Sequence, residues 1–336
     1  MKKLFFLLAC VAMSVLSMAQ VNQLVWANGR LLYGSPITNV DSLTYDESAG
    51  MDTLLLPRVL MKEVHDTVYV TQVVHDTVYV ETDCGEDTPS SAGIGAFSVS
   101  ADKQVTFSPG NLQYHPANDE WRFAENQTDY IGDANSNCSP TYNGWLDLFG
   151  FSGSTGSAKF GVSTSQDYAD YSGSFVDWGE NKIGSDAPNT WRTLTFDEWH
   201  YLLNIRANAS SLKGVAQVNG INGLILLPDN WTCPAGVTFK SGFHSSYGLE
   251  TYGQYQTFTA EQWSKLESAG AVFLPAAGDR LGAAARRYLQ LNGHYWYTNE
   301  YGSSLAYFLN FSSGGAGMGG GEFRDRGMSV RLVKDL

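Results

Sequence analysis

Only two stretches of this chain carry a strong helix signal, and both open with the same capping box. Thr195 lies three residues before Glu198, and Thr259 lies three residues before Gln262. In a capping box the Thr hydroxyl and the Glu or Gln side chain each satisfy a backbone N–H group at the start of a helix. Gly270 is placed to end the second helix. Most of the core must therefore come from strands and loops.

The remaining signals from residue 93 onward are short apolar runs in a sequence dense in Gly, Trp, Tyr and Phe. The predicted strands are 104–107, 223–227, 272–274, 306–311 and 329–333, and long loops are expected at 150–161 and 314–321. The apolar faces of the helices hold Trp199, Leu202, Leu203, Trp263 and Leu266, and Trp296 and Phe308 are also expected in the core. Few helices among short strands and long loops predict an α+β fold.

The N-terminus predicts export. Lys2 and Lys3 precede an apolar run over 4–16 that ends in Ser-Met-Ala at 17–19, which is the pattern of a signal peptide cleaved after Ala19. The alternative is a lipoprotein signal, in which a lipid on Cys10 would be the membrane attachment. We therefore expect a secreted or cell-surface protein.

Three further segments follow from the sequence. Residues 20–60 predict a small β element, 61–92 a repeat stalk and linker, and 93–336 the main domain. The stalk prediction rests on Val-His-Asp-Thr-Val-Tyr-Val, which occurs at 64–70 and again at 74–80. Ten residues is an even period, so both copies present the same side chains on one face of an extended chain. Two copies are too few for a solenoid.

The repeat also suggests a modification. Asp-Thr-Val resembles the O-glycosylation acceptor of Bacteroidetes, and the candidate sites are Ser42, Thr53, Thr67 and Thr77. The alternative is that Thr and Val are there because they favour strands. His65 and His75 would lie roughly 30 Å apart in an extended chain, too far to share a metal ion.

Charge and cysteine content exclude other classes. The net charge of −13 argues against nucleic acid, which needs a basic surface. Cys84, Cys138 and Cys233 lack zinc-ligand spacing, although one disulfide, such as Cys138 to Cys233, fits an oxidising compartment. Asp-Ala-Asn-Ser-Asn at 133–137 starts like a calcium loop but lacks its later Gly and Glu, so we expect a polar surface turn.

No enzyme and no cofactor is predicted. The sequence has no Gly-x-Ser-x-Gly motif between a strand and a helix, and nothing selects a pair of carboxylates for glycoside hydrolysis.

Five short motifs carry a resemblance to a known family. They are Trp-Arg-Thr-Leu-Thr at 191–195, Leu-Leu-Pro at 226–228, Phe-Leu-Pro-Ala-Ala-Gly-Asp-Arg at 273–280, Gly-His-Tyr-Trp-Tyr-Thr at 293–298 and Gly-Met-Ser-Val-Arg-Leu-Val at 327–333. In this order they resemble the C-type-lectin-like domains of secreted Bacteroidetes proteins. That group is related to the formylglycine-generating-enzyme fold, to Fibrobacter-type major paralogous domains and to the variable proteins of diversity-generating retroelements. The resemblance covers 93–336 and implies a C-type-lectin-like fold.

The resemblance does not imply the family's enzymatic or calcium chemistry. The enzyme branch uses two cysteines near the C-terminus, and this chain has none after Cys233. The calcium-dependent sugar-binding motifs of animal lectins are also missing from the sequence.

The segment 286–323, together with Arg324 directly after it, is the predicted ligand-binding region. It mixes Tyr, Asn and Arg with Ser and Gly, a composition typical of recognition surfaces. The predicted contact residues are Arg286, Arg287, Tyr288, Gln290, Asn292, His294, Tyr297, Asn299, Tyr301, Tyr307, Phe323 and Arg324. In the retroelement-diversified relatives the corresponding stretch is variable and faces the ligand.

We therefore expect an exported recognition protein that binds an external protein or glycan. The alternatives are a structural cell-surface or fimbrial component and, third, an extracytoplasmic enzyme.

Overall fold

The computed structural model describes residues 22–27, 30–36, 59–64, 67–73 and 95–336, with the side chains of 95–336 except that of Arg286. The chain divides into two units, Met1–Glu86 and Asp87–Leu336, at a point inside the predicted linker. The predictions for residues 1–19 and for Cys10, Ser42, Thr53, Thr77 and Cys84 lie outside the described residues.

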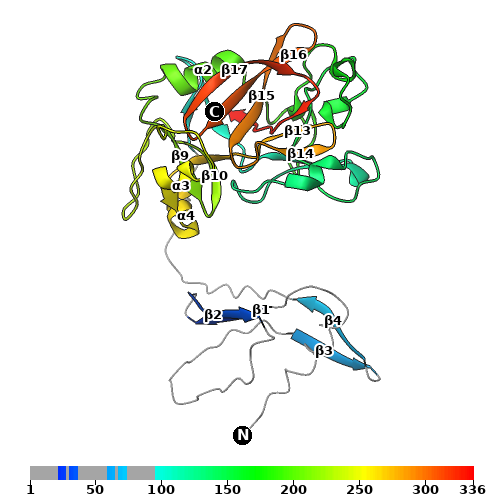
Figure 1. The fold of residues 1–336 in the computed structure, drawn as a ribbon, viewed down its shortest axis with the longest axis vertical. Helices are drawn as coiled ribbons and strands as arrows, with labels where there is room; N and C mark the ends of the chain where they lie inside the picture. The colour runs from blue at the N-terminus through cyan, green and yellow to red at the C-terminus, as the bar shows by residue number, and fades with distance from the viewer. Residues whose placement is uncertain (1–21, 28–29, 37–58, 65–66, 74–94) are drawn as a thin grey trace. The chain divides into compact units, whose positions relative to one another are not determined.

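The first unit contains two antiparallel hairpins (Figure 1). β1 (Asn22–Ala27) pairs with β2 (Arg30–Pro36), and β3 (Val59–Val64) pairs with β4 (Thr67–Val73). The first hairpin agrees with the predicted small β element.

The second hairpin corrects the stalk prediction for the first repeat copy. Val64 ends β3, Thr67 begins β4, and the two residues face each other across the pair. The copy at 64–70 therefore folds back on itself instead of running on as an extended spacer. Its Val, Thr and Tyr residues favour strands, and pairing satisfies the backbone groups that a lone strand would leave open. The second copy lies outside the described residues.

In the second unit, the first capping box is confirmed. The Thr195 hydroxyl accepts from the Glu198 N–H, the Glu198 carboxylate accepts from the Thr195 N–H, and α2 (Phe196–His200) follows. The helix continues as one π-helical turn, η8 (Tyr201–Ile205), which buries Leu202 and Leu203.

The second capping box is confirmed as well. Thr259 and Gln262 exchange the same pair of hydrogen bonds ahead of α4 (Ala260–Ser268), and Gly270 follows with φ of 90°. A third helix, α3 (Thr251–Tyr255), has no side-chain hydrogen bond at its N-cap, and the sequence reading missed it.

A four-stranded sheet forms one half of the core. Its order is β11 (Thr257–Phe258), β9 (Lys213–Val218), β10 (Ile221–Leu226) and β12 (Val272–Pro275), antiparallel except for β11 beside β9. Alternate residues of β10 enter different hydrophobic clusters on the two faces. Both faces of this sheet are therefore buried.

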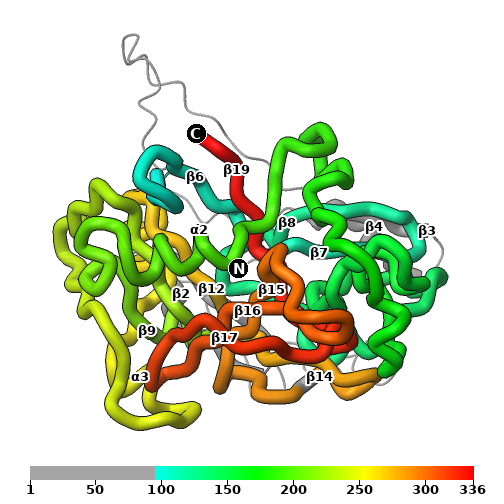
Figure 2. Tube along the Cα trace, turned by 90° about the horizontal axis from the view of Figure 1, so that it is seen from above, coloured from blue at the N-terminus to red at the C-terminus, as the bar shows by residue number. Residues whose placement is uncertain are grey.

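A second, antiparallel sheet has the order β15 (Asn292–Tyr301), β16 (Leu305–Ser312) and β17 (Gly315–Phe323). Figure 2 shows β17 along the outside of this sheet, with β16 between it and β15. The prediction of a loop at 314–321 is therefore wrong. Glycines weaken the strand signal because they have low β propensity, but here pairing with β16 determines the conformation.

Shorter elements complete the unit. They are β5 (Phe97–Ser98), β6 (Gln104–Phe107), β7 (Leu112–His115), β8 (Glu120–Phe123), β13 (Asp279–Leu281), β14 (Ala284–Arg287), β18 (Arg326–Gly327), β19 (Val333–Asp335) and the single 3₁₀ turns 116–118, 132–136, 159–161, 168–171 and 178–180. The observed architecture is α+β, rich in strands and with few helices.

The strand predicted at 329–333 is displaced. β19 begins only at Val333 and pairs with β6, while Met328 and Ser329 form isolated bridges to Phe149 and Tyr295. Residues 328–333 are completely or almost completely buried. Their apolar residues are therefore explained by burial in the core, because only the last of them, Val333, belongs to the strand β19. Trp296 and Phe308, predicted as core residues, are 1% and 9% exposed.

Cys138 and Cys233 are both free, so the disulfide between them is not formed. Each thiol lies near a carbonyl oxygen of its own loop, that of Asn135 and that of Val237. Burial raises the pKa of the Cys138 thiol. Within the described residues, none of the helices has the length and apolar character needed to cross a bilayer.

Candidate functional site

The β15–β16–β17 sheet has one face in the core and one face that opens toward its outer edge. Tyr295, Leu309 and Phe311 point into the core. The register places the other side chains on the opposite face. We call this the glycine face, and its residues are Asn292, His294 and Trp296 from β15, Phe308, Asn310 and Ser312 from β16, and Gly315, Gly317 and Gly319 from β17.

Burial on the glycine face falls toward β17 and toward the turn between β16 and β17. Trp296 and Phe308 are buried, whereas Asn310 and Ser312 are only partly buried. A shallow hollow of about 330 Å³ lies here, lined by Asn310, Ser312 and residues 315–319. The lining offers amide, hydroxyl and backbone groups and contains no ionisable side chain.

Three glycines of this sheet are required by packing. A Cβ atom would lie 2.0 Å from the Phe311 ring at Gly293, 2.7 Å from the Phe308 ring at Gly319 and 2.3 Å from the Tyr301 ring at Gly321.

Gly315 and Gly317 differ from these three. A Cβ atom at either position would have no neighbour within 4 Å, and neither residue has a positive φ. Glycine costs stability inside a strand, so packing and backbone conformation leave both residues unexplained. Glycine in a strand interior often marks a place where a ligand or another backbone approaches closely.

Polar side chains stand beside the hollow in a fixed arrangement. Asn292 Nδ2 donates to Asn310 Oδ1 at 3.1 Å, and the Tyr247 hydroxyl donates to Asn292 Oδ1 at 2.8 Å. Partial burial and then the neighbouring Tyr288 raise the pKa of Tyr247, so its hydroxyl keeps its proton at neutral pH. These bonds leave Asn310 Nδ2 without a hydrogen bond to the described part of the chain. That amide group is free to donate to a ligand.

His294, a residue of the glycine face, and Arg287 both approach the buried carboxylate of Asp279. His294 is 7% exposed, and its Nδ1 atom lies 3.3 Å from Asp279 Oδ2. Arg287 Nε lies 3.6 Å from the other oxygen of Asp279, and Tyr288 packs edge-on against the His294 ring. His294 was predicted as a ligand contact, but its side chain is buried beside Asp279, so we assign it a role in packing.

A second group of predicted residues lies at the far end of β15. Tyr301 and Phe323 are 49% and 44% exposed, Tyr307 packs against Tyr301, and Phe323 stacks on the exposed Tyr168. Ten strand residues place this aromatic group roughly 30 Å from Asn292. The predicted region therefore contains two surfaces separated by the buried middle of β15.

Tyr297 and Arg324 were predicted as ligand contacts, and both predictions are wrong because the two side chains are buried. Tyr297 is fully buried, and burial raises its pKa well above the usual range. Arg324 is 1% exposed; its guanidinium donates to the carbonyls of Gly173 and Gly302 at 2.8 and 3.0 Å and lies 3.1 Å from Glu300. The sequence predicted that Arg324 would contact a ligand, but its guanidinium donates to backbone carbonyls and so connects two loops of the domain.

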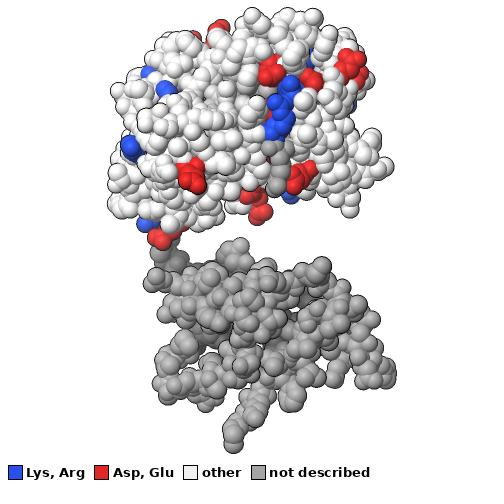
Figure 3. All heavy atoms as spheres, viewed as in Figure 1, with Lys and Arg blue, Asp and Glu red and all other residues white. Residues whose placement is uncertain are grey.

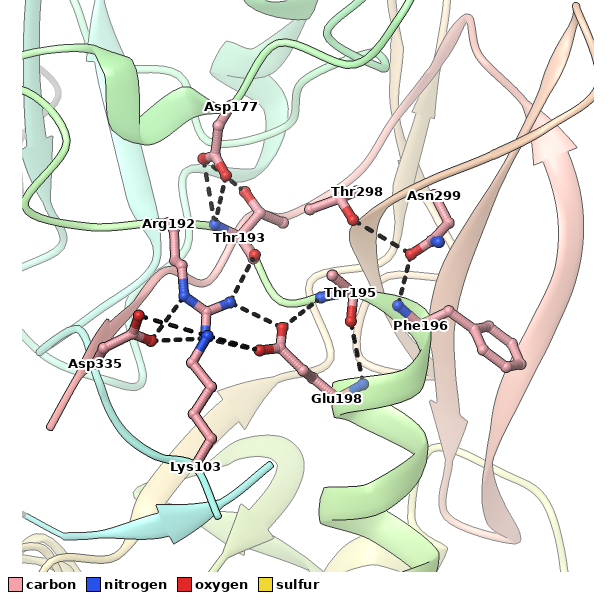
Figure 4. Close-up of polar contacts among 10 residues, drawn as sticks. All are labelled: Lys103, Asp177, Arg192, Thr193, Thr195, Phe196, Glu198, Thr298, Asn299 and Asp335. Atoms are coloured by element: carbon pink, nitrogen blue, oxygen red, sulfur yellow. Dashed lines mark hydrogen bonds and ion pairs between the residues drawn. The ribbon is translucent and has the colours of Figure 1, made fainter. Parts of the chain in front are cut away.

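Asn299 and Gln290 also have their side chains engaged. Asn299 Oδ1 accepts from the Phe196 N–H at 2.6 Å, at the start of α2 (Figure 4). Gln290 Oε1 accepts from the Asn222 N–H at 2.7 Å. Tyr288 is 46% exposed and remains a surface candidate, while nothing is described of the Arg286 side chain.

Figure 4 also shows what Arg192, in the motif at 191–195, contacts. Arg192 lies between Glu198 and Asp335, at 2.8 and 2.7 Å, and Lys103 joins both carboxylates. Burial opposes ionisation of Glu198, but bonds from Arg192 and the Thr195 N–H outweigh it, so its pKa lies below the usual range. This network ties α2 to β19 and is structural.

The calcium-like segment is a 3₁₀ turn. Its Asn135 is fully buried and bonds to Asp147, so the turn is anchored inward and is less superficial than predicted. Within the described residues, no three His, Cys, Asp or Glu side chains are grouped as metal ligands. Figure 3 shows a face that is mostly uncharged, where Lys and Arg gather in one place beside Asp and Glu.

Sequence reasoning found Asn292 but missed Tyr247, Asn310, Ser312 and the two unexplained glycines. The alternation along 305–312 puts Asn310 and Ser312 on the face of Phe308, so β16 did carry a usable signal. Tyr247 lies in a loop, and no pattern connects it to Asn292.

No protein family model matches this chain, and no curated protein or solved structure matches it.

Proposed function

We propose that this chain is an exported recognition protein whose C-terminal unit has a C-type-lectin-like fold and binds an external protein or glycan at the glycine face. The observation that carries this proposal is the empty space above Gly315 and Gly317. These two glycines lower strand stability without relieving a clash, so a role in admitting a ligand is the best account of them.

The chemistry of the hollow favours an uncharged polar ligand. The Asn310 amide and the Ser312 hydroxyl offer donors and acceptors, and the exposed backbone of β17 offers more. A few fixed polar groups beside a concave surface are the usual means of orienting a ligand. An ionic group would find no counter-charge in this lining.

The test is to fill the hollow. Gly317→Val places a β-branched side chain over it, in a conformation that suits a strand. We expect the variant to fold with unchanged or higher thermal stability and to lose binding to ligands found by screening the wild-type full chain on a glycan array and a displayed peptide library.

Gly320→Val is the matched control, because Gly320 also has no neighbour within 4 Å of its Cβ position but does not line the hollow. Equal binding by Gly317→Val and wild type would contradict the proposal.

A further inference from the structure

The hydrogen-bonding direction of each residue in this sheet can be deduced from β15. The backbone of Asn292, His294 and Trp296 bonds away from β16: Gly278 N–H donates to Asn292 O, Ser329 N–H donates to His294 O, and Trp296 N–H donates to Ser329 O, at 2.9 to 3.2 Å. In an antiparallel strand, consecutive residues direct their backbone groups to opposite sides. Gly293 and Tyr295 therefore bond to β16.

The same alternation continues across the sheet. Leu309 and Phe311, opposite Tyr295 and Gly293, bond back to β15, so Phe308, Asn310 and Ser312 bond to β17. Their partners on β17 are Gly319, Gly317 and Gly315. The residues between these glycines, Ala316 and Met318, must direct their N–H and C=O groups outward.

The outer edge of β17 is open. No segment in the described part of the chain makes a backbone hydrogen bond to Ala316 or Met318 there. Natural edge strands are usually protected by Lys, Pro, bulges or a covering element, because an open edge pairs readily with another strand. Residues 315–321 contain no Lys, no Pro and no charge.

We propose that β17 receives an extended segment of a partner protein as a fourth strand of this sheet. This inference rests on the proposed function and specifies its ligand. The added strand would bond to the outward groups of Ala316 and Met318. Its alternate side chains would lie beside Gly315 and Gly317, where the hollow has room for bulky uncharged residues.

Charge and area identify the occupant. The chain carries a net charge of −13, which disfavours an acidic segment, and the lining offers no ionic partner. A second copy of β17 would bring mostly glycine, so a β17–β17 pair would bury little side-chain area, whereas a stable interface buries roughly 1,200 Å² or more. A foreign segment with large alternate residues fills the space that two β17 strands would leave empty.

Ala316→Pro tests the edge specifically. It removes one outward N–H group and keeps the inner hydrogen bonds, because proline is tolerated at an outward-facing edge position. Ala316→Val is the matched control, which retains the N–H. The probe is a displayed library of random linear 12-residue peptides, selected on the wild-type full chain.

The expected result is a set of uncharged peptides with alternating bulky residues that bind wild type and Ala316→Val and bind Ala316→Pro at least tenfold more weakly. In wild type, peptide binding should slow amide hydrogen exchange at Ala316 and Met318, a readout that does not depend on how well the variants fold. Peptides that bind Ala316→Pro as tightly as wild type, or exchange that stays unchanged, would overturn the proposal.

The two proposals fail differently. A ligand that is lost in Gly317→Val but kept in Ala316→Pro supports recognition at the glycine face and refutes strand addition. Concentration-dependent dimers that disappear in Ala316→Pro would make a second copy the occupant and also refute the partner segment. A library that yields no binder refutes strand addition by a linear segment, while glycan binding would leave the broader function standing.

Discussion

Asn135 and Asp147 form a hydrogen-bonded pair in which both side chains are fully buried. Asn135 Nδ2 donates to one carboxylate oxygen at 2.7 Å, and the Ile131 N–H donates to the other at 2.8 Å. Burial outweighs these bonds and raises the pKa of Asp147 from its usual 3.8 to about 6. The folded state therefore holds this proton more tightly than the unfolded chain does.

The buried carboxyl should make stability depend on pH. Its contribution is fully present below about pH 4 and is lost as the pH rises through about 6, a change of up to about 3 kcal/mol. We expect the unfolding free energy of wild type, minus that of Asp147→Asn, to fall by about that amount between pH 4 and pH 7.5 in urea titrations. Other carboxylates cancel in this difference. A difference that does not vary with pH would contradict the buried ionisable carboxyl.

Arg324 should be among the most costly positions to change. Arg324→Met leaves the carbonyls of Gly173 and Gly302 without their hydrogen-bond donor. It also removes the buried guanidinium that pairs with the Glu300 carboxylate. We expect a loss of about 3–5 kcal/mol in unfolding free energy, measured by denaturant titration. The neighbouring exposed Phe323 gives the control, since Phe323→Ala should cost less than about 1 kcal/mol. Equal effects would mean that Arg324 does not join these loops.

Two glycines of the same sheet should respond oppositely to alanine. Gly293→Ala forces a Cβ atom into the Phe311 ring and should lower the unfolding free energy by about 1–3 kcal/mol. Gly315→Ala meets no atom and should be neutral or stabilising by about 0.5 kcal/mol, because alanine reduces the entropy of the unfolded chain. Thermal melts of the two variants decide this, and a destabilised Gly315→Ala would show that packing does require that glycine.

Asn299 should affect stability and not recognition. Asn299→Ala leaves the Phe196 N–H at the start of α2 without its acceptor, at a cost of about 1–2 kcal/mol. Ligands found with the wild-type chain should bind the variant with unchanged affinity at a temperature where both proteins are folded. A selective loss of binding would return Asn299 to the ligand-contact set.

The helices and several strands could be predicted because their signals are local. Thr195 and Thr259 each form a capping box with a residue three positions later, and this pattern marks the start of a helix. The boundaries of β6 follow from a short alternation of apolar and polar residues. The strand over 315–323 could not be predicted in this way, because its conformation comes from pairing with β16 and glycine carries little propensity of its own.

The candidate site was only partly predictable for a related reason. Composition indicated the segment 286–323 but could not distinguish the exposed Tyr301 from the buried Tyr297. The two tyrosines differ in burial because a bulge interrupts the strand pairing between Trp296 and Glu300. Arg324 shows the same limit, because the sequence alone does not distinguish a buried Arg that donates to backbone carbonyls from an exposed Arg that contacts a ligand.

The pairing of β19 with β6 has a consequence for the timing of folding. Val330 and Leu332 fill the interior just before β19, which joins a strand more than two hundred residues earlier. During translation, the part of this unit that contains β6 must wait for residues 330–335 before its interior can close. The unit therefore cannot complete its core one segment at a time along the chain, and a polypeptide cut before Val330 should remain incompletely folded.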